Sequence, residues 1–279
     1  MPFWRRLLRF ARNDGQNRYT LRMTFPPDSP LVDQVCPSPN HQPRRGVARP
    51  DILLLHYTGM ATTQAALERL CDRDAKVSSH YVVFEDGRVF QLVAEARRAF
   101  HAGESAWEGT TDINSRSIGI EIGNKGHDYG CPEFPEPQIA VVIALCRDII
   151  VRWSIAPWHV LAHSDVAPLR KRDPGEAFPW ARLAAAGVGL WVEPATIEQG
   201  KALGAGDRGE EVARLQRMLA DYGYGITPSG HYDEATQEIV AAFQRHFWPA
   251  QVDGVADIST VRTLEALHER RGWPGQARP

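Results

Sequence analysis

Two histidines and one aspartate are the residues of this sequence whose types and spacing best suit metal chemistry. His56 follows the apolar run 52–55, while His163 and Asp173 share one short segment that a Pro-Gly pair closes. Two imidazoles and one carboxylate make a three-ligand zinc set that leaves a fourth position for water. Because an open position is typical of catalytic rather than structural zinc, the pattern predicts metal-assisted hydrolysis.

Two charged residues suit the chemistry that such a metal would need. Glu121 lies in the apolar run 117–122, where a carboxylate must face a site or pair with a cation because unpaired burial is costly. Lys171 lies two residues before Asp173, and a cation there can stabilise a developing oxyanion. The alternatives are a structural salt bridge for Glu121 and a solvated side chain for Lys171.

These residues together resemble the motifs of the type-2 zinc N-acetylmuramoyl-L-alanine amidases, over about residues 31–190. The resemblance implies Zn²⁺ as the cofactor, with His56, His163 and Asp173 as its ligands. It also implies that Glu121 is the general base and that Lys171 supports the oxyanion. The implied reaction cleaves the amide between N-acetylmuramic acid and L-alanine, in peptidoglycan or in muropeptides, during cell-wall turnover or recycling.

Four further residues are expected to bind the substrate. His80 and His101 lie in the segments 78–81 and 100–103, which resemble parts of the family that line the substrate cleft. Trp107 and Asn114 are expected to contact sugar or peptide. An aromatic face stacks well on a sugar, but a tryptophan is equally suited to a core, so both interpretations of Trp107 stay open.

The C-terminal region has a different character, with helical patterns alone. Residues 203–267 resemble the small three-helix peptidoglycan-binding domain, and the alternative is a generic helical bundle. The resemblance is carried by the segments Leu215-Gln216, Asp221-Tyr222-Gly223-Tyr224, Ala241-Ala242-Phe243-Gln244 and Val252-Asp253-Gly254.

The order of patterns predicts an α/β fold with a mixed central sheet flanked by helices, of the type shared by these amidases and peptidoglycan recognition proteins. A small three-helix all-α domain follows it. Strands are expected near 51–55, 81–84, 89–93, 117–122 and 160–162, and helices near 62–71, 137–153 and 178–186, with caps at Asp233 and Ser259 for two later helices. The predicted divisions are an N-terminal extension (1–30), a zinc amidase domain (31–190), a linker (191–203), a peptidoglycan-binding-like domain (204–270) and a tail (271–279).

Bulk properties restrict the partners. The net charge of −2 gives no reason to expect nucleic acid, no apolar run approaches a membrane span, and no protein partner is implied. We find no secretory signal, which favours the cytoplasm, whereas the C-terminal domain favours the cell envelope. Residues 1–22 are either a flexible extension or an artefact of the start site, with Met23 as the true first residue. The four cysteines show no metal-type spacing.

Two rival functions remain at this stage. A non-catalytic peptidoglycan recognition protein shares the fold, but the complete metal set favours an enzyme. A zinc peptidase acting within the stem peptide is the other alternative, although the sequence lacks the His-Glu-x-x-His motif. The C-terminal domain is expected to fold separately, so truncation near Trp191 should leave the hydrolysis of small muropeptides nearly intact.

Overall fold

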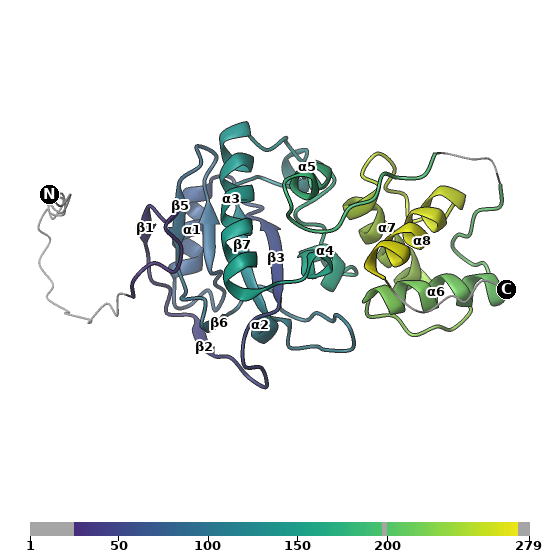
Figure 1. Cartoon of the computed structure of the whole chain (residues 1–279), viewed down its shortest axis with the longest axis horizontal. Helices are drawn as coiled ribbons and strands as arrows, with labels where there is room; N and C mark the ends of the chain where they lie inside the picture. Colours follow the sequence, from purple (N-terminus) through teal and green to yellow (C-terminus); the bar gives the residue numbers. More distant parts are fainter. Residues whose placement is uncertain (1–24, 197–199, 273–279) are drawn as a thin grey trace, which may run out of the picture.

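The computed structural model describes residues 25–196 and 200–272, and its centre is a mixed six-stranded sheet. The strands follow the order β1-β5-β4-β7-β3-β8, and Figure 1 shows them beside the C-terminal helices. In that order they span Gln34–Val35, Val89–Gln91, Tyr81–Val83, Ser117–Ile122, Ile52–Tyr57 and Val160–Ala162. A second sheet pairs β2 (His41–Pro43) with β6 (Arg97–Ala99). The predicted α/β class with a mixed sheet and flanking helices is confirmed.

Eight α-helices lie within the described residues. They are α1 (Thr63–Cys71), α2 (Ile113–Arg116), α3 (Glu136–Trp153), α4 (His163–Val166), α5 (Trp180–Ala185), α6 (Glu210–Tyr222), α7 (Glu234–Phe247) and α8 (Ile258–Arg271), with 3-10 turns at His127–Tyr129 and Pro157–His159. The predicted cap at Asp233 is confirmed, because its side chain accepts from the Thr236 backbone. The cap predicted at Ser259 is wrong, since Asp257 caps α8 by accepting from the Thr260 backbone at 2.7 Å.

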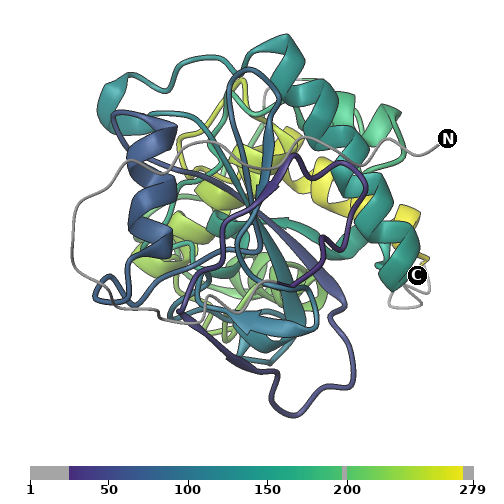
Figure 2. The same cartoon turned by 90° about the vertical axis from the view of Figure 1, so that its left-hand side faces the viewer.

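Alternation along the strands separates a structural face of the sheet from a functional one. Leu53 and Leu55 of β3 pack in the core that α3 covers, and successive strand residues point to opposite faces. His56 therefore shares the other face with Leu54. Figure 2 shows α1 and α3 on either side of the strands, with the C-terminal helices behind. Full burial of each leucine stabilises the sheet by roughly 1.5–3 kcal/mol. This burial fixes the register of β3 and so the face of the sheet on which His56 lies.

The C-terminal helices share a hydrophobic core with the sheet domain. Leu54, Trp107 and Val166 belong to the same buried cluster as Tyr222 and Phe247. Glu108 N–H donates to Gly223 O at 2.8 Å across this contact. α6–α8 form the predicted three-helix unit, and one side of that unit is buried against the sheet domain. Separate folding of this unit stays a prediction.

Two further expectations concern the N-terminal extension and membrane-spanning segments. Residues 1–24, which include most of the predicted extension, lie outside the described residues. Asp28, placed by the sequence in that extension, accepts from Glu95 N–H at 2.9 Å and so packs on the sheet domain. Across residues 25–196 and 200–272, no helix has the length and apolar character needed to span a bilayer.

Candidate active site

The strand register brings the candidate residues together from distant parts of the chain. His56 on β3 pairs directly with Glu121 on the parallel strand β7. Leu55 pairs with Ala162, the last residue of β8, so that His163 follows at the next position. Three neighbouring strands thus deliver two imidazoles and a carboxylate to one edge of the sheet, where their carboxyl ends meet.

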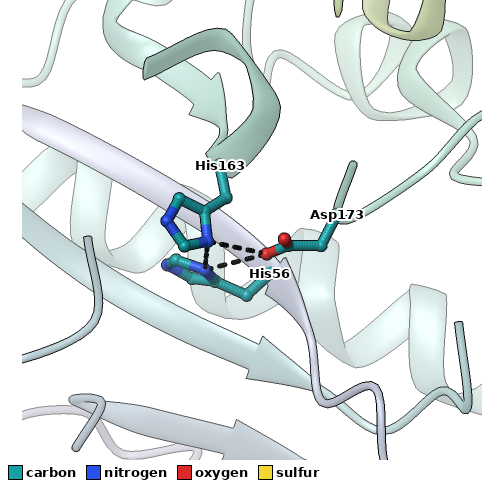
Figure 3. Close-up of side chains that lie close together, drawn as sticks. All are labelled: His56, His163 and Asp173. Atoms are coloured by element: carbon teal, nitrogen blue, oxygen red, sulfur yellow. Dashed lines mark hydrogen bonds and ion pairs between the residues drawn. The ribbon is translucent and has the colours of Figure 1, made fainter. Parts of the chain in front are cut away.

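His56, His163 and Asp173 converge on one point. The Nδ1 atoms of the two imidazoles lie 2.9 Å apart, and Asp173 Oδ2 lies 3.1 Å from Nδ1 of His56 and 3.0 Å from Nδ1 of His163. Figure 3 shows all three side chains directed at one another. These separations approach the roughly 3.3 Å edge of a tetrahedron with metal bonds of about 2.0–2.1 Å. The three ligand atoms can therefore hold one metal ion.

Outer hydrogen bonds assign the tautomers that this arrangement needs. His163 Nε2 lies 3.1 Å from the carbonyl oxygen of Ala102, which can only accept, so the hydrogen sits on Nε2. His56 Nε2 lies 3.0 Å from His101 Nδ1, and His101 Nε2 faces the Ser117 hydroxyl. With His101 donating from Nε2 to that hydroxyl, its Nδ1 accepts from His56 Nε2. With these hydrogens on Nε2, both Nδ1 lone pairs face Asp173. Such facing lone pairs repel one another without a cation between them, so the donor set fits a metal.

The burial of the triad favours the ionisation states of metal ligands. Burial, with the neighbouring His163, lowers the pKa of His56 to about 4, so that the ring is neutral near pH 7. Burial alone would raise the pKa of Asp173, but the adjacent His163 and His56, when an imidazole carries a proton on Nδ1, outweigh it and hold that pKa well below its ordinary value. Neutral imidazoles and an ionised carboxylate are the forms that bind zinc.

Glu121 and Lys171 face the same cavity, whose volume is about 610 Å³. Burial and the negative charge of Asp173 raise the pKa of Glu121 to about 8, while Lys171 acts in the opposite direction. Glu121 Oε2 is buried, and no described residue offers it a hydrogen bond. A buried carboxylate without a partner, facing a cavity beside a metal triad, is suited to proton transfer.

Comparison with known proteins decides the family. Residues 46–176 match the family model described as N-acetylmuramoyl-L-alanine amidase, and residues 208–264 match a putative peptidoglycan binding domain. The chain is 39% identical over 244 residues to the N-acetylmuramoyl-L-alanine amidase AmiD of Escherichia coli, covering 83% of this chain and 87% of that protein. The chain belongs to the N-acetylmuramoyl-L-alanine amidase family.

Two solved structures of such amidases resemble this one over most of their length. The first, E. coli AmiD in complex with anhydro-N-acetylmuramic acid-L-Ala-D-gamma-Glu-L-Lys, has a TM-score of 0.68 at 37% identity and covers 83% of this chain and 93% of that one. The second is AmpDh3 of Pseudomonas aeruginosa with an anhydromuramic pentapeptide, at a TM-score of 0.65 and 28% identity, covering 92% of this chain and 98% of that one. The predicted family, amidase activity and peptidoglycan-binding domain are confirmed.

Three of the four residues expected to bind substrate do not line the amidase cavity. Trp107 has no exposed surface and packs edge-on against Tyr224, at 5.1 Å between ring centroids, so its core interpretation is the right one. His80 is also fully buried, and its Nδ1 accepts from Gly119 N–H. Asn114 Oδ1 accepts from the backbone N–H groups of His101 and Ala102, each at 2.9 Å. The three side chains therefore pack within the fold in this structure, and their contact with the substrate stays a prediction.

His101 does line the cavity, but its contacts give it a further role. Its ring bridges His56 and Ser117, so it orients His56, a candidate metal ligand. Sequence reasoning missed this role, together with the part that Gly119 plays in it. A Cβ on Gly119 would lie 2.5 Å from His101 Nδ1, so only glycine admits the ring there. The Ile-Gly-Ile spacing within an apolar strand was the signal that marked a close approach.

Proposed function

We propose that this protein is a zinc-dependent amidase that releases the stem peptide from muropeptides, with one zinc ion held by His56, His163 and Asp173. The observation that carries the proposal is the buried triad, whose ligand atoms lie 2.9–3.1 Å apart with their lone pairs converging. The amidase family to which the chain belongs is generally zinc-dependent. When bound, zinc supplies Lewis-acid chemistry, because it acidifies water and polarises a carbonyl.

The side chains around the triad supply the remaining steps. Glu121 accepts a proton from the water that attacks the lactyl amide carbonyl, and it returns the proton to the departing nitrogen of L-alanine. Lys171 lines the same cavity as Asp173 and stabilises the oxyanion that forms on the carbonyl oxygen. The water forms the new C–O bond as the C–N bond breaks, so the products are a carboxylic acid and a free amine.

The substrate that we favour is a soluble anhydromuramyl peptide. Both amidase structures described above hold an anhydromuramic peptide, and the present cavity has the size of a small-ligand site. Its wall carries Lys125, Arg170 and Arg172 in addition to Lys171. A stem peptide bears several carboxylates, and this cationic wall suits them. The peptidoglycan-binding domain adds contact with the polymer.

The test separates metal binding from chemistry by comparing two substitutions. Glu121→Gln keeps the shape of the side chain but removes the base, so zinc content should stay near one per chain while turnover falls by roughly 10²–10⁴-fold. His163→Ala removes a ligand, so zinc and activity should be lost together. Metal analysis and a soluble-muropeptide assay read out both effects. If Glu121→Gln lost its zinc, or kept normal turnover, its assigned role would be wrong.

A further inference from the structure

The metal-ligand turn α4 is too short to hold itself in place. It has four residues, and no side chain of its preceding residue caps it. Its third residue, Asp165, instead reaches back, so that Oδ2 accepts from Ala162 N–H at 2.8 Å. Ser164 N–H donates to the carbonyl of Asp173 at 3.0 Å, which links the positions of the two metal ligands that border this segment. The carboxylate of Asp165 therefore organises the turn on which His163 stands.

The remaining hydrogen bonds to Asp165 come from the C-terminal domain. Tyr224 donates its hydroxyl to Oδ1 at 2.9 Å, and His246 Nδ1 donates to Oδ2 at 2.7 Å. All three side chains are at most 3% exposed. His246 also stacks on Trp180, with 3.8 Å between ring centroids. Figure 1 shows α4 lying between the sheet and α7, which carries His246.

We propose that Tyr224 and His246 are positioning residues for the zinc site, so that the C-terminal domain has a second function besides contact with the polymer: it clamps the turn that carries His163. This inference rests on the proposed zinc site. Buried hydrogen bonds outside the ligand sphere fix the orientation of metal ligands, and their loss typically weakens metal binding by about 10–100-fold. Here the clamp acts through Asp165 and α4 rather than by contact with the metal.

A pair of tyrosine substitutions tests the clamp on the full chain. Tyr224→Phe removes only the hydroxyl that bonds Asp165. Tyr232→Phe is the matched control, because this tyrosine is also buried in the C-terminal domain but donates to Gly254 O, at 2.7 Å. The measurement is the zinc dissociation constant by competition with a chelator, together with thermal unfolding. We expect zinc affinity to fall about tenfold in Tyr224→Phe and to stay at the wild-type value in Tyr232→Phe, with comparable losses of thermal stability.

A second pair tests rescue at His246. Leucine removes the donor, while asparagine, of similar shape, retains an N–H that can reach Asp165. Zinc affinity should fall in His246→Leu and recover at least partly in His246→Asn, and saturating zinc should restore turnover of a soluble muropeptide in both. Wild-type zinc affinity in both Tyr224→Phe and His246→Leu would overturn the clamp alone. Absence of zinc from the wild-type protein would instead overturn the proposed function.

A second group of possible metal ligands, separate from the first, consists of His127, Cys131 and Glu176. One ligand atom from each residue lies within 4.8 Å of the others, and all three residues are half-buried. His127 Nε2 lies 2.9 Å from Glu176 Oε2, and Tyr57 lies on the other side of the ring, 3.0 Å from Nδ1. A Cβ on Gly175 would come within 3.1 Å of Cys131 Sγ and 3.2 Å of His127 Cε1, so glycine leaves the ligands room to converge.

From this geometry we infer a second cation site, for zinc or another divalent metal that accepts sulfur and nitrogen ligands. A thiolate, an imidazole and a carboxylate form a mixed donor set that such metals bind and that Mg²⁺ or Ca²⁺ does not favour. The cluster adjoins the first site along the chain, since Glu176 follows Asp173 by three residues and Tyr57 follows His56. A metal here would link the segments 127–131 and 173–176, which border the cavity.

Cobalt distinguishes the two sites, because His56, His163 and Asp173 include no sulfur. The metal-free protein should bind two Co²⁺ ions and develop a thiolate-to-cobalt charge-transfer absorption with the second. Cys131→Ser should abolish that absorption and retain one Co²⁺. Cys146→Ser, which alters a buried cysteine elsewhere, should behave like the wild type. Binding of a single Co²⁺ by the wild type, or survival of the absorption in Cys131→Ser, would exclude the second site.

Discussion

At the scale of single residues, the proposed chemistry depends on shifted pKa values of three groups in one cavity, His56, Asp173 and Glu121. His56 is neutral and Asp173 is ionised, as metal ligands must be. Glu121 lies beside them with its pKa raised to about 8, first by burial and then by the charge of Asp173. Because Lys171 opposes that shift, the lysine affects the base as well as the oxyanion. This coupling is open to a direct test.

Lys171→Met should move the acid limb of the pH–rate profile to higher pH. A general base works only when deprotonated, so the rate rises with pH through the pKa of Glu121. Burial raises this pKa above its ordinary value of 4.5 and Lys171 lowers it, so loss of the lysine removes a lowering influence and the limb shifts upward. Turnover should also fall by roughly 10²–10³-fold through loss of oxyanion stabilisation.

Arg172→Met supplies the control for this shift. Arg172 is the next residue, has the same charge and also lines the cavity, but it does not act on the pKa of Glu121. Its substitution should leave the acid limb in place, whatever it does to KM. The profile of kcat/KM for a soluble muropeptide gives the answer. An unmoved limb in Lys171→Met, or an equal shift in both variants, would show that Lys171 does not set the pKa of the base.

At the scale of elements, the parallel pairing of β3 with β7 and β8 decides where the active site lies. The register places Glu121 beside His56 and starts α4 directly after β8. The site then needs close contact between β7 and the His101 ring, which Gly119 permits. The backbone of β7 at Gly119 thus helps to shape the candidate metal site.

Gly119→Ala should weaken zinc binding without altering any ligand. The added Cβ would lie 2.5 Å from His101 Nδ1 and would displace the ring that orients His56. Loss of such an outer hydrogen bond typically weakens metal binding by about 10–100-fold. Gly204→Ala is the control, because no atom lies within 4 Å of the added methyl group. Chelator competition on both proteins measures the difference, and equal zinc affinities would refute the role given to Gly119.

The strands and the polar residues near their ends were predictable from sequence. The contacts that surround the candidate site, such as those of Asp165, were not. The apolar runs of β3 and β7 carry His56 and Glu121 near their ends, and this pattern selected two residues that the structure brings to one cavity. The sequence could not decide the role of Trp107. An aromatic residue in a loop has no periodicity that distinguishes a sugar-stacking surface from a core residue. Asp165 also escaped notice, since its partners Tyr224 and His246 follow it by 59 and 81 positions.

At the scale of the whole molecule, the two domains act as one unit around a shared core. Trp107 is buried beneath Tyr222 and Tyr224, and Arg271 of α8 bonds Glu108 at 2.5 Å. The contact continues to Asp165, within the turn α4 that carries His163. A domain that only tethered the enzyme to polymer would need none of these contacts with the metal-ligand turn.

Truncation after residue 190 should therefore impair the amidase even on a small substrate. Removal of α6–α8 uncovers Trp107 and Val166, and each large apolar side chain that loses its cover forfeits roughly 1.5–3 kcal/mol. The midpoint of thermal unfolding and the hydrolysis of a soluble muropeptide should both fall. This outcome replaces the expectation of near-intact hydrolysis from sequence. A truncated protein with wild-type stability and turnover would contradict the shared core.

The central claim is zinc-dependent cleavage at the N-acetylmuramoyl-L-alanine bond, and mass spectrometry of the products tests it most directly. Metal-free protein and protein restored with one equivalent of zinc are incubated separately with an anhydromuramyl tripeptide. The zinc form should yield the intact tripeptide with a free L-alanine amine, together with the sugar acid, and the metal-free form should yield neither. Cleavage within the tripeptide, or equal product without metal, would contradict the account.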